Sequence, residues 1–283
     1  INIFIKILKM GPYGLVWILL FSCGENSTED LEINGQEEES VQLQLSAQNT
    51  LESVSFLVGD TYELDAVAFA NDGILAKGTE LLDCGTLYIE LLPTGRKTIR
   101  NFETNCTTKN GILVSGKIIS VITLDRVNFT ASIRHTFENF YVDGNKVEGT
   151  VEVEKLFINA FGNPQANKIF DISILKKDGM VLVMKGQNQR EWIEGLTTTD
   201  RSDDVFLITG TYTISDQNGG VYTHRIKEPL RRELACTHIV KGTIELIKNS
   251  RTIILDFGNG ECDALATIEN NGKLREITLR NKN

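Results

Sequence analysis

The chain holds only 4 prolines in 283 residues, and it has no uninterrupted apolar stretch of the roughly 20 residues that a membrane-spanning helix needs. Such scarcity of proline leaves long strands possible, and Pro93, Pro164 and Pro229 fall where turns or strand edges are expected. No basic stripe is present and the formal net charge is −9, which excludes a nucleic-acid partner because phosphates are bound by clustered lysine and arginine.

Motifs for catalysis, metals and cofactors are also missing. No Cys-x-x-Cys pair occurs, which argues against a zinc or redox site. Ser173 and Lys176 have the spacing of serine β-lactamases, but they lie in an expected strand, where they point to opposite faces. The segment from Gly111 to Lys117 resembles a phosphate-binding loop but runs into a strand instead of a helix. We therefore expect no catalytic residues, no metal and no cofactor.

The amino-terminal residues have the pattern of an export signal. Lys6 and Lys9 precede an apolar run over 15–21, and the segment ends Leu20-Phe21-Ser22-Cys23. This boundary resembles the lipobox of bacterial lipoproteins, with leucine at −3, a small residue at −1 and cysteine at +1. We expect residues 1–22 to be a lipoprotein signal peptide and Cys23 to carry the lipid, because several acyl chains give stable anchoring.

Two segments separate the anchor from the rest. Residues 23–40 hold seven acidic and no basic side chains, which predicts a flexible acidic tether. Residues 41–78 show partial helical spacing and predict a lead-in with one or two short helices. Acids soon after the lipidated cysteine also resemble a surface-export signal, so we expect an outer-membrane lipoprotein, with display on the cell surface as the favoured orientation.

From residue 79 to residue 283 the pattern is β. Alternating and β-branched segments are separated by turn pairs such as Asp143-Gly144, Asp178-Gly179, Asn218-Gly219 and Asn271-Gly272, which supply the positive φ of tight hairpins. About a dozen strands at this spacing predict an all-β antiparallel meander, either a sandwich or an extended sheet.

Four further cysteines are expected to form two disulfides, since an exported protein meets an oxidising compartment. The midpoint of Cys84 and Cys106 falls in the turn at Gly95, and that of Cys236 and Cys262 falls at Asn249. Each pair therefore lies across the mouth of its own hairpin, which favours Cys84–Cys106 and Cys236–Cys262. The hairpins 84–106 and 236–262 also resemble each other in sequence, indicating an internal duplication; the matching segments are Arg-Lys-Thr-Ile (96–99) with Arg-Thr-Ile-Ile (251–254), and Asn-Phe (101–102) with Asp-Phe (256–257).

Several segments together are similar to a family of uncharacterised Bacteroidota envelope lipoproteins. They are residues 139–150, 190–195, 203–210, 256–263 and 275–279, and the resemblance covers roughly 80–280. It implies a β-rich, lipid-anchored protein and no particular activity. One departure is that Asn101-Phe102-Glu103-Thr104-Asn105 lacks the two glycines of the second copy.

Three groups of residues remain as candidate sites. His135, His224 and His238 have no ligand spacing, and the first two are expected to face solvent. Oxygens of Asp256, Asn259 and Asp263 fit a calcium loop, although a glycine-rich turn with local hydrogen bonds is favoured. Trp192 is either a sugar-stacking platform or, as we favour, a core or hairpin residue.

The composition and motifs together predict a non-enzymatic binding, adhesion or structural module of the cell envelope, attached to the membrane by its lipid. A glycan or a surface protein is the expected class of partner. The alternative is a glycan-active hydrolase, which requires two carboxylates facing each other across a cleft, either about 5–5.5 Å or about 6.5–9.5 Å apart.

Overall fold

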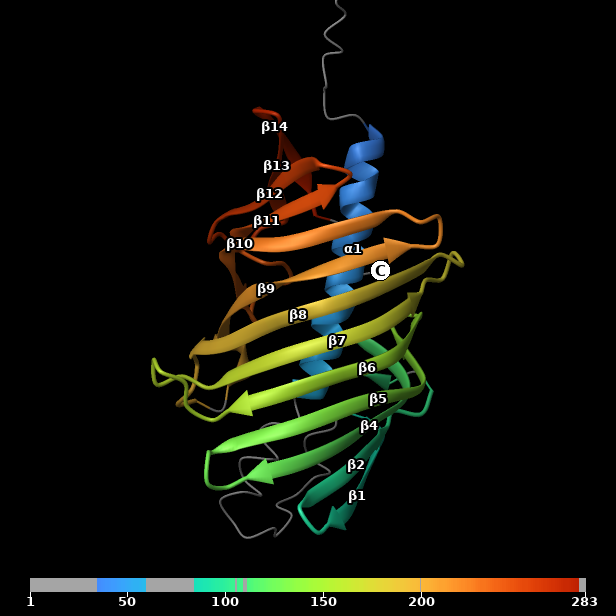
Figure 1. Cartoon of the computed structure of the whole chain (residues 1–283), viewed down its shortest axis with the longest axis vertical. Coiled ribbons are helices and arrows are strands. Elements are labelled where there is room, and N and C mark those ends of the chain that lie inside the picture. Colours follow the sequence, from blue (N-terminus) through green and yellow to red (C-terminus); the bar gives the residue numbers. More distant parts are fainter. Residues whose placement is uncertain (1–34, 60–83, 105, 109–110, 199, 280–283) are drawn as a thin grey trace, which may run out of the picture. The chain divides into compact units, whose positions relative to one another are not determined.

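The computed structural model describes residues 35–59 and 84–279, except 105, 109–110 and 199. One helix, α1 (Gly35–Gly59), precedes fourteen strands that belong to a single sheet (Figure 1). The strands are β1 (Thr86–Leu92), β2 (Gly95–Asn101), β3 (Cys106–Thr107), β4 (Leu113–Asp125), β5 (Thr130–Val142), β6 (Asn145–Leu156), β7 (Gln165–Leu175), β8 (Val181–Glu194), β9 (Val205–Asp216), β10 (Val221–Glu233), β11 (Lys241–Lys248), β12 (Arg251–Asn259), β13 (Leu265–Asn270) and β14 (Lys273–Thr278), with a 3₁₀ turn at Arg201–Asp203.

The sheet is an antiparallel meander, as predicted. Strand order follows the chain from β1 to β14, with only the two-residue β3 placed off the path beside β4. Of the two alternatives left open by the sequence, the extended sheet is therefore the one that forms. Two of the predicted turns show the expected backbone, with φ of 49° and 79° at Asp143 and Gly144, and 51° and 78° at Asn271 and Gly272.

The start of the helix corrects the predicted domain limits. α1 begins at Gly35, inside the segment 23–40 that was predicted to be a flexible tether, and continues without interruption to Gly59. A single helix of 25 residues thus replaces the one or two short helices expected in 41–78. The remainder of that predicted lead-in, 60–78, lies outside the described residues.

One face of the sheet, called the inner face here, packs on α1 (Figure 1). Leu51, Val54 and Leu57 of the helix share a core with strand residues such as Ile118 and Phe170. Nearer its amino terminus the helix joins a second core, in which Val41 and Leu45 meet residues of β9–β14. The helix therefore contributes to both cores, as does β9, which places Tyr212 and Ile214 in the first core and Ile208 in the second.

Polar contacts fix the position of α1 along the sheet. Gln42 Nε2 donates to the carbonyl of Thr278 at 3.0 Å, and Gln44 Oε1 lies 3.0 Å from His224 Nε2. At the other end, Arg100 Nη1 of β2 donates to the Leu57 carbonyl at 2.6 Å. The last turn of α1 has no basic residue of its own, so Arg100 supplies the positive charge that a helix carboxyl end favours.

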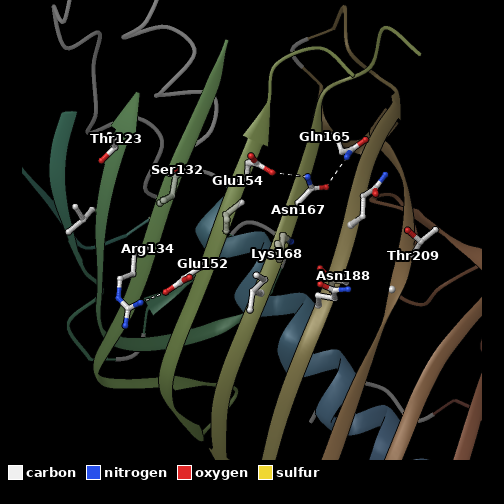
Figure 2. Close-up of a pocket in the computed structure, with 17 residues that line it drawn as sticks. Thr123, Ser132, Arg134, Glu152, Glu154, Gln165, Asn167, Lys168, Asn188 and Thr209 are labelled. Atoms are coloured by element: carbon white, nitrogen blue, oxygen red, sulfur yellow. Dashed lines mark hydrogen bonds and ion pairs between the residues drawn. The ribbon is translucent and has the colours of Figure 1, made fainter. Parts of the chain in front are cut away.

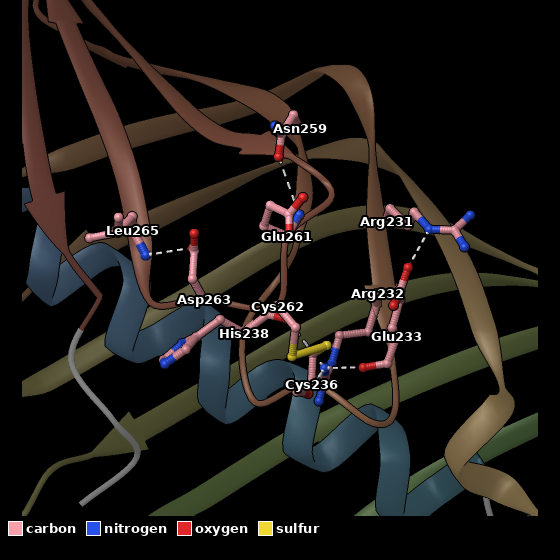
Figure 3. The surroundings of a disulfide bond; sticks show 10 residues. All are labelled: Arg231, Arg232, Glu233, Cys236, His238, Asn259, Glu261, Cys262, Asp263 and Leu265. Atoms are coloured by element: carbon pink, nitrogen blue, oxygen red, sulfur yellow. Dashed lines mark hydrogen bonds and ion pairs between the residues drawn. A yellow bond between two sulfur atoms is a disulfide. The ribbon is translucent and has the colours of Figure 1, made fainter.

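The two predicted disulfides are present. Cys84–Cys106 and Cys236–Cys262 each have a Cα–Cα separation of 5.6 Å, and each closes the mouth of a hairpin, β1–β2 and β11–β12. Figure 3 shows the second bond beside the β10–β11 connection. In this region Arg232 Nη1 donates to the carbonyls of Glu233, Cys236 and His238, so one guanidinium joins the cysteine loop to β10.

Candidate functional site

A groove of about 690 Å³ lies on the outer face of the sheet, opposite α1 (Figure 2). It crosses β4 to β9, and its volume is within the range usual for ligand sites. Sequence reasoning did not predict it. Its lining residues come from strands about 85 residues apart in the chain, and only the strand register brings them together.

The register aligns hydrogen-bonding side chains in one row that crosses six strands. Direct pairs link Thr123 to Ser132, Ser132 to Glu154 and Glu154 to Asn167. The row then continues from Asn167 to Gln189 and from Gln189 to Thr209. We call these six residues the polar row. Neighbouring strands are about 4.8 Å apart, so the row extends for roughly 24 Å perpendicular to the strands.

Side-chain hydrogen bonds hold the middle of the polar row in place. Asn167 Nδ2 donates to Glu154 Oε2 at 3.1 Å, and Gln165 Nε2 donates to Asn167 Oδ1 at 2.8 Å (Figure 2). These contacts orient the amides while leaving other lone pairs and N–H groups for a ligand.

Charges beside the polar row are neutralised in pairs. Arg134 and Glu152 form an ion pair across β5 and β6 (Figure 2), and Lys185 Nζ lies 3.0 Å from Asp171 across β7 and β8. Glu154 is then the one row member with a charge. The carboxylates among the described lining residues, Glu152 and Glu154, stand on the same strand and do not face each other across the groove.

The inner face contains buried polar groups, and here the prediction for two histidines was wrong. His135 and His224 are each only 1% exposed, instead of facing solvent. His135 Nδ1 lies 2.7 Å from Ser120 Oγ. Burial lowers the pKa of His224 to about 3, and burial followed by the charges of Lys155, Arg100 and Lys168 lowers the pKa of His135.

Lys168 of β7 is buried on the same inner face, beside its cross-strand neighbour Asn188. Burial is the main cause that lowers the pKa of its ammonium to about 7; the nearby Arg190 lowers it further, whereas Glu52 of α1 opposes the shift. Glu52 Oε2 lies 3.8 Å from Arg190 Nη1, so a largely buried ion pair joins α1 to β8.

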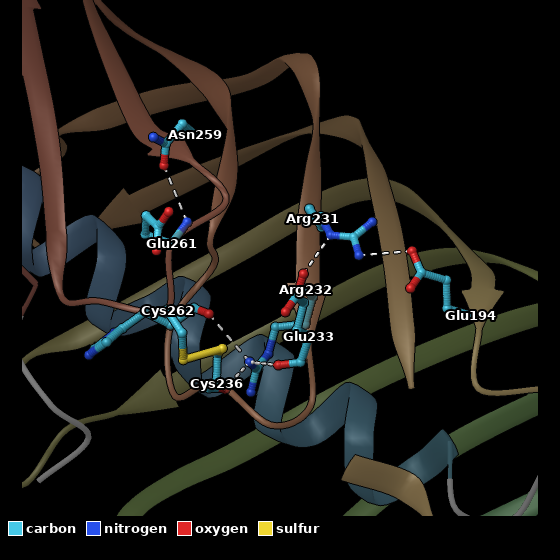
Figure 4. A network of polar contacts seen from close by, with 9 residues as sticks. Glu194, Arg231, Arg232, Glu233, Cys236, Asn259, Glu261 and Cys262 are labelled. Atoms are coloured by element: carbon cyan, nitrogen blue, oxygen red, sulfur yellow. Dashed lines mark hydrogen bonds and ion pairs between the residues drawn. A yellow bond between two sulfur atoms is a disulfide. The ribbon is translucent and has the colours of Figure 1, made fainter. Parts of the chain in front are cut away.

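Arg231 and Arg232, adjacent residues of β10, both make contacts within the fold (Figure 4). Arg231 donates to Glu233 at 2.6 Å and to Glu194 at 2.8 Å, joining β8 to β10. Hydrogen bonds to these two carboxylates raise the pKa of Arg231. Both arginines therefore stabilise the connection that carries Cys236.

The remaining sequence candidates occupy local roles. Trp192 is partly buried, stacks on Phe206 with ring centroids 5.8 Å apart, and donates through Nε1 to the carbonyl of Glu194. Asp256, Asn259 and Asp263 each accept a hydrogen bond from a backbone N–H two residues later, which are the local hydrogen bonds expected of a glycine-rich turn. The described residues contain no group of three His, Cys, Asp or Glu side chains suited to a metal.

Comparison with known proteins gives no relative. No family model, curated protein or solved structure matches this chain. Within the described ranges no helix has the length and apolar content needed to cross a membrane. The function must therefore be inferred from the groove and from the sequence patterns.

Proposed function

We propose that this chain is a lipid-anchored protein of the bacterial envelope whose outer groove binds an extended, neutral glycan. The observation that carries the proposal is the polar row. Each of six successive strands contributes one residue to it, with a hydroxyl, an amide or a carboxylate group. A chain lying perpendicular to the strands would meet a new hydrogen-bonding side chain about every 4.8 Å.

Charge favours a neutral polymer. The basic and acidic side chains around the row are paired with each other, and the whole chain has a net charge of −9. An acidic polysaccharide or a nucleic acid would meet Glu154 without a compensating basic patch. Sugar hydroxyls, in contrast, both donate to carboxylate and amide oxygens and accept from amide N–H groups.

The cellular location rests on the sequence. The apolar run before Cys23 and the lipobox-like boundary support export and lipidation, and a Bacteroidota outer-membrane lipoprotein is the family that the chain resembles. Two disulfides agree with an oxidising compartment. An exposed face of a surface lipoprotein is a suitable place to bind a glycan.

Binding is favoured over hydrolysis because of how the two groove carboxylates are arranged. Hydrolysis requires an acid on each side of the scissile bond. Glu152 and Glu154 come from one strand, and Arg134 and Asn167 hold them. Incubating the full chain with neutral glycans and measuring new reducing ends tests this directly: release that stops in Glu154→Gln would replace binding by hydrolysis.

The binding test uses isothermal titration of the full chain with neutral oligosaccharides of increasing length. We expect Asn167→Ala and Gln189→Ala each to weaken binding about tenfold, and affinity to increase until the ligand covers the row. Ser173→Ala is the matched control, because Ser173 lies on the outer face of β7 but outside the groove. Equal loss in all three variants, or no binding to any neutral glycan, would contradict the proposal.

A further inference from the structure

Two neighbouring loops on one rim of the sheet differ in chemistry from the turns on the opposite rim and from the charged β8–β9 connection beside them, which holds Asp200 and Asp203. The β4–β5 turn (126–129) and the β6–β7 loop (157–164) lie on the left in Figure 1 and carry highly exposed apolar side chains. Val127 is 86% exposed, Phe129 65%, Ile158 72% and Phe161 83%. A hydrogen bond from Phe157 N to the Phe129 carbonyl at 3.3 Å joins the two loops. We call these four side chains the apolar rim.

The opposite rim is polar. Its turns are Asp143-Gly144, residues 176–180 with Asp178-Gly179, and residues 217–220 with Asn218-Gly219. Apolar residues near it, such as Leu175 and Val221, belong to strands and are 42% and 49% exposed. Polar turns on both rims would keep the protein soluble. The exposed apolar side chains on one rim therefore indicate a surface that contacts a partner.

Local hydrogen bonds hold the β4–β5 turn in one conformation. Asp125 Oδ1 accepts from the N–H groups of Val127 and Asn128 at 2.9 and 3.0 Å, and its Oδ2 accepts from Asn128 Nδ2. Phe129 follows with a φ of 51°, a conformation that a bulky side chain rarely adopts. The turn thus holds an exposed phenylalanine in a strained backbone, which is a frequent mark of a functional position.

A second network fixes the β6–β7 loop. Asn159 Oδ1 accepts from the N–H groups of Phe161 and Asn163, while Asn159 Nδ2 and Asn163 Nδ2 both donate to Glu191 Oε1 at 2.9 Å. Ile158 and Phe161 are therefore presented by an ordered loop. Ordering the loops in advance lowers the entropic cost of inserting their tips into another phase.

We propose that the apolar rim inserts into the interface of a lipid bilayer whose headgroups are zwitterionic. The four side chains project from loop tips, which can enter a bilayer one by one, as residues at membrane interfaces do. Arg126 is the charged residue of these two loops, and Asp125, the last residue of β4, carries the opposite charge directly before it. A neutral rim has no electrostatic preference for anionic lipid.

The anchor makes this geometry possible, and this step rests on the proposed lipidation of Cys23. About a dozen residues separate Cys23 from the start of α1, a length that can reach roughly 40 Å when extended. The first turns of α1 contact β10 and β14: Ser40 Oγ lies 2.5 Å from Tyr222 OH, and Glu38 Oε2 lies 2.5 Å from Arg275 Nη2. β6 is four strands away from β10, about 20 Å, so the tether is long enough for the rim to meet the membrane that holds the lipid.

The first experiment measures partitioning to phosphatidylcholine vesicles with the full chain carrying Cys23→Ala, so that no acyl chain contributes. We expect Phe129→Asn with Phe161→Ser to reduce the partition coefficient about a hundredfold, tenfold for each ring. Asparagine is chosen at 129 because it tolerates positive φ. The matched control, Leu175→Ser with Val221→Ser on the polar rim, should change partitioning less than threefold.

A second measurement places the rim relative to the lipid. In the full chain with Trp17→Phe and Trp192→Phe, which removes both native tryptophans, Phe129→Trp should be quenched by bilayer-embedded bromine, whereas Tyr141→Trp beside the polar rim should not. Equal quenching at both positions, or equal loss of partitioning in rim and control variants, would overturn the proposal. Glycan titration of the Phe129→Asn, Phe161→Ser chain separates the two proposals, because the groove should bind normally even if the rim does not insert.

Discussion

Glu103 and Gly258 occupy the same position in the two copies of the disulfide-closed hairpin. Both follow a buried phenylalanine, Phe102 or Phe257, and both have positive φ, 53° and 86°. Each also donates its backbone N–H to the side chain two positions earlier. Glu103 N donates to Asn101 Oδ1 at 3.2 Å, and Gly258 N donates to Asp256 Oδ1 at 2.8 Å. The two hairpins, which resemble each other in sequence, thus share a positive φ and the same local hydrogen bond at this position.

Replacing Glu103 by glycine should stabilise the protein. A glutamate with positive φ is strained by about 1–2 kcal/mol, and the greater freedom of glycine in the unfolded chain offsets part of the gain. We expect the free energy of unfolding to rise by roughly 0.5–1 kcal/mol in urea denaturation. Gly258→Glu, the reverse change in the second copy, should lower it. If Glu103→Gly is destabilising, the positive φ is not a source of strain.

Each disulfide should stabilise the fold by on the order of 3 kcal/mol, since the two cross-links close loops of 22 and 26 residues. The variants Cys84→Ser, Cys106→Ser and Cys236→Ser, Cys262→Ser should therefore unfold at lower denaturant concentration than the parent chain. Adding reductant to the parent should reproduce the loss. Variants whose stability is indistinguishable from that of the oxidised parent would show that the hairpins are closed equally well by their strands.

Burial of His224 predicts a loss of stability in acid. Its pKa in the folded protein is about 3, below the ordinary 6.5, so the unfolded chain binds the proton first and stability falls as the pH drops from about 6.5 towards 3. The loss through this group is on the order of 4 kcal/mol. His224→Gln, which retains an N–H donor for Gln44, should flatten the pH dependence. His135 remains in both chains, and its contribution cancels in the comparison.

Acid should also loosen the β4–β5 turn. Hydrogen bonds from Asn128 and Val127 lower the pKa of Asp125 below 3.8, so their stabilisation is complete above that pH and is lost as the pH falls through the lower, folded value. Amide signals of Val127 and Asn128 should shift in this range in NMR spectra. Asp125→Ala should show the loosened turn at neutral pH, whereas unchanged amide signals in that variant would remove the carboxylate from its role in shaping the turn.

Local signals in the sequence were sufficient for the strands, turns and cysteine pairs. Asp143-Gly144 and Asn271-Gly272 define hairpins by themselves, because their positive φ suits the twist of adjacent strands. Each disulfide joins residues across one hairpin, so it too could be deduced from neighbouring segments.

The histidine error could have been avoided. His135 has the same parity as Ile133 and Phe137, and His224 has the same parity as Tyr222 and Ile226, so strand alternation places both on the apolar face. Ser120 and Gln44, which provide the hydrogen bonds that permit burial, are 15 and 180 residues away.

The groove could not be predicted, because its polar row depends on the register of six strands at once. A one-residue slip between two strands would turn every side chain of one of them to the opposite face. The alternation Glu152-Val153-Glu154 indicates an outer polar face, but it does not indicate which residues of β7 or β8 lie beside it.

The order of strands has a consequence for how the chain folds. Each strand pairs with the next one along the chain, so hairpins can add one after another as the polypeptide emerges, with short loops to close at each step. The helix is made before all of them, yet Gln44 must wait for His224 and Gln42 for Thr278, 180 and 236 residues later. Although α1 is synthesised before the strands, it is thus the last element to be fixed in its final position. Its glutamines need water or a chaperone as hydrogen-bond partner until the last strands have formed.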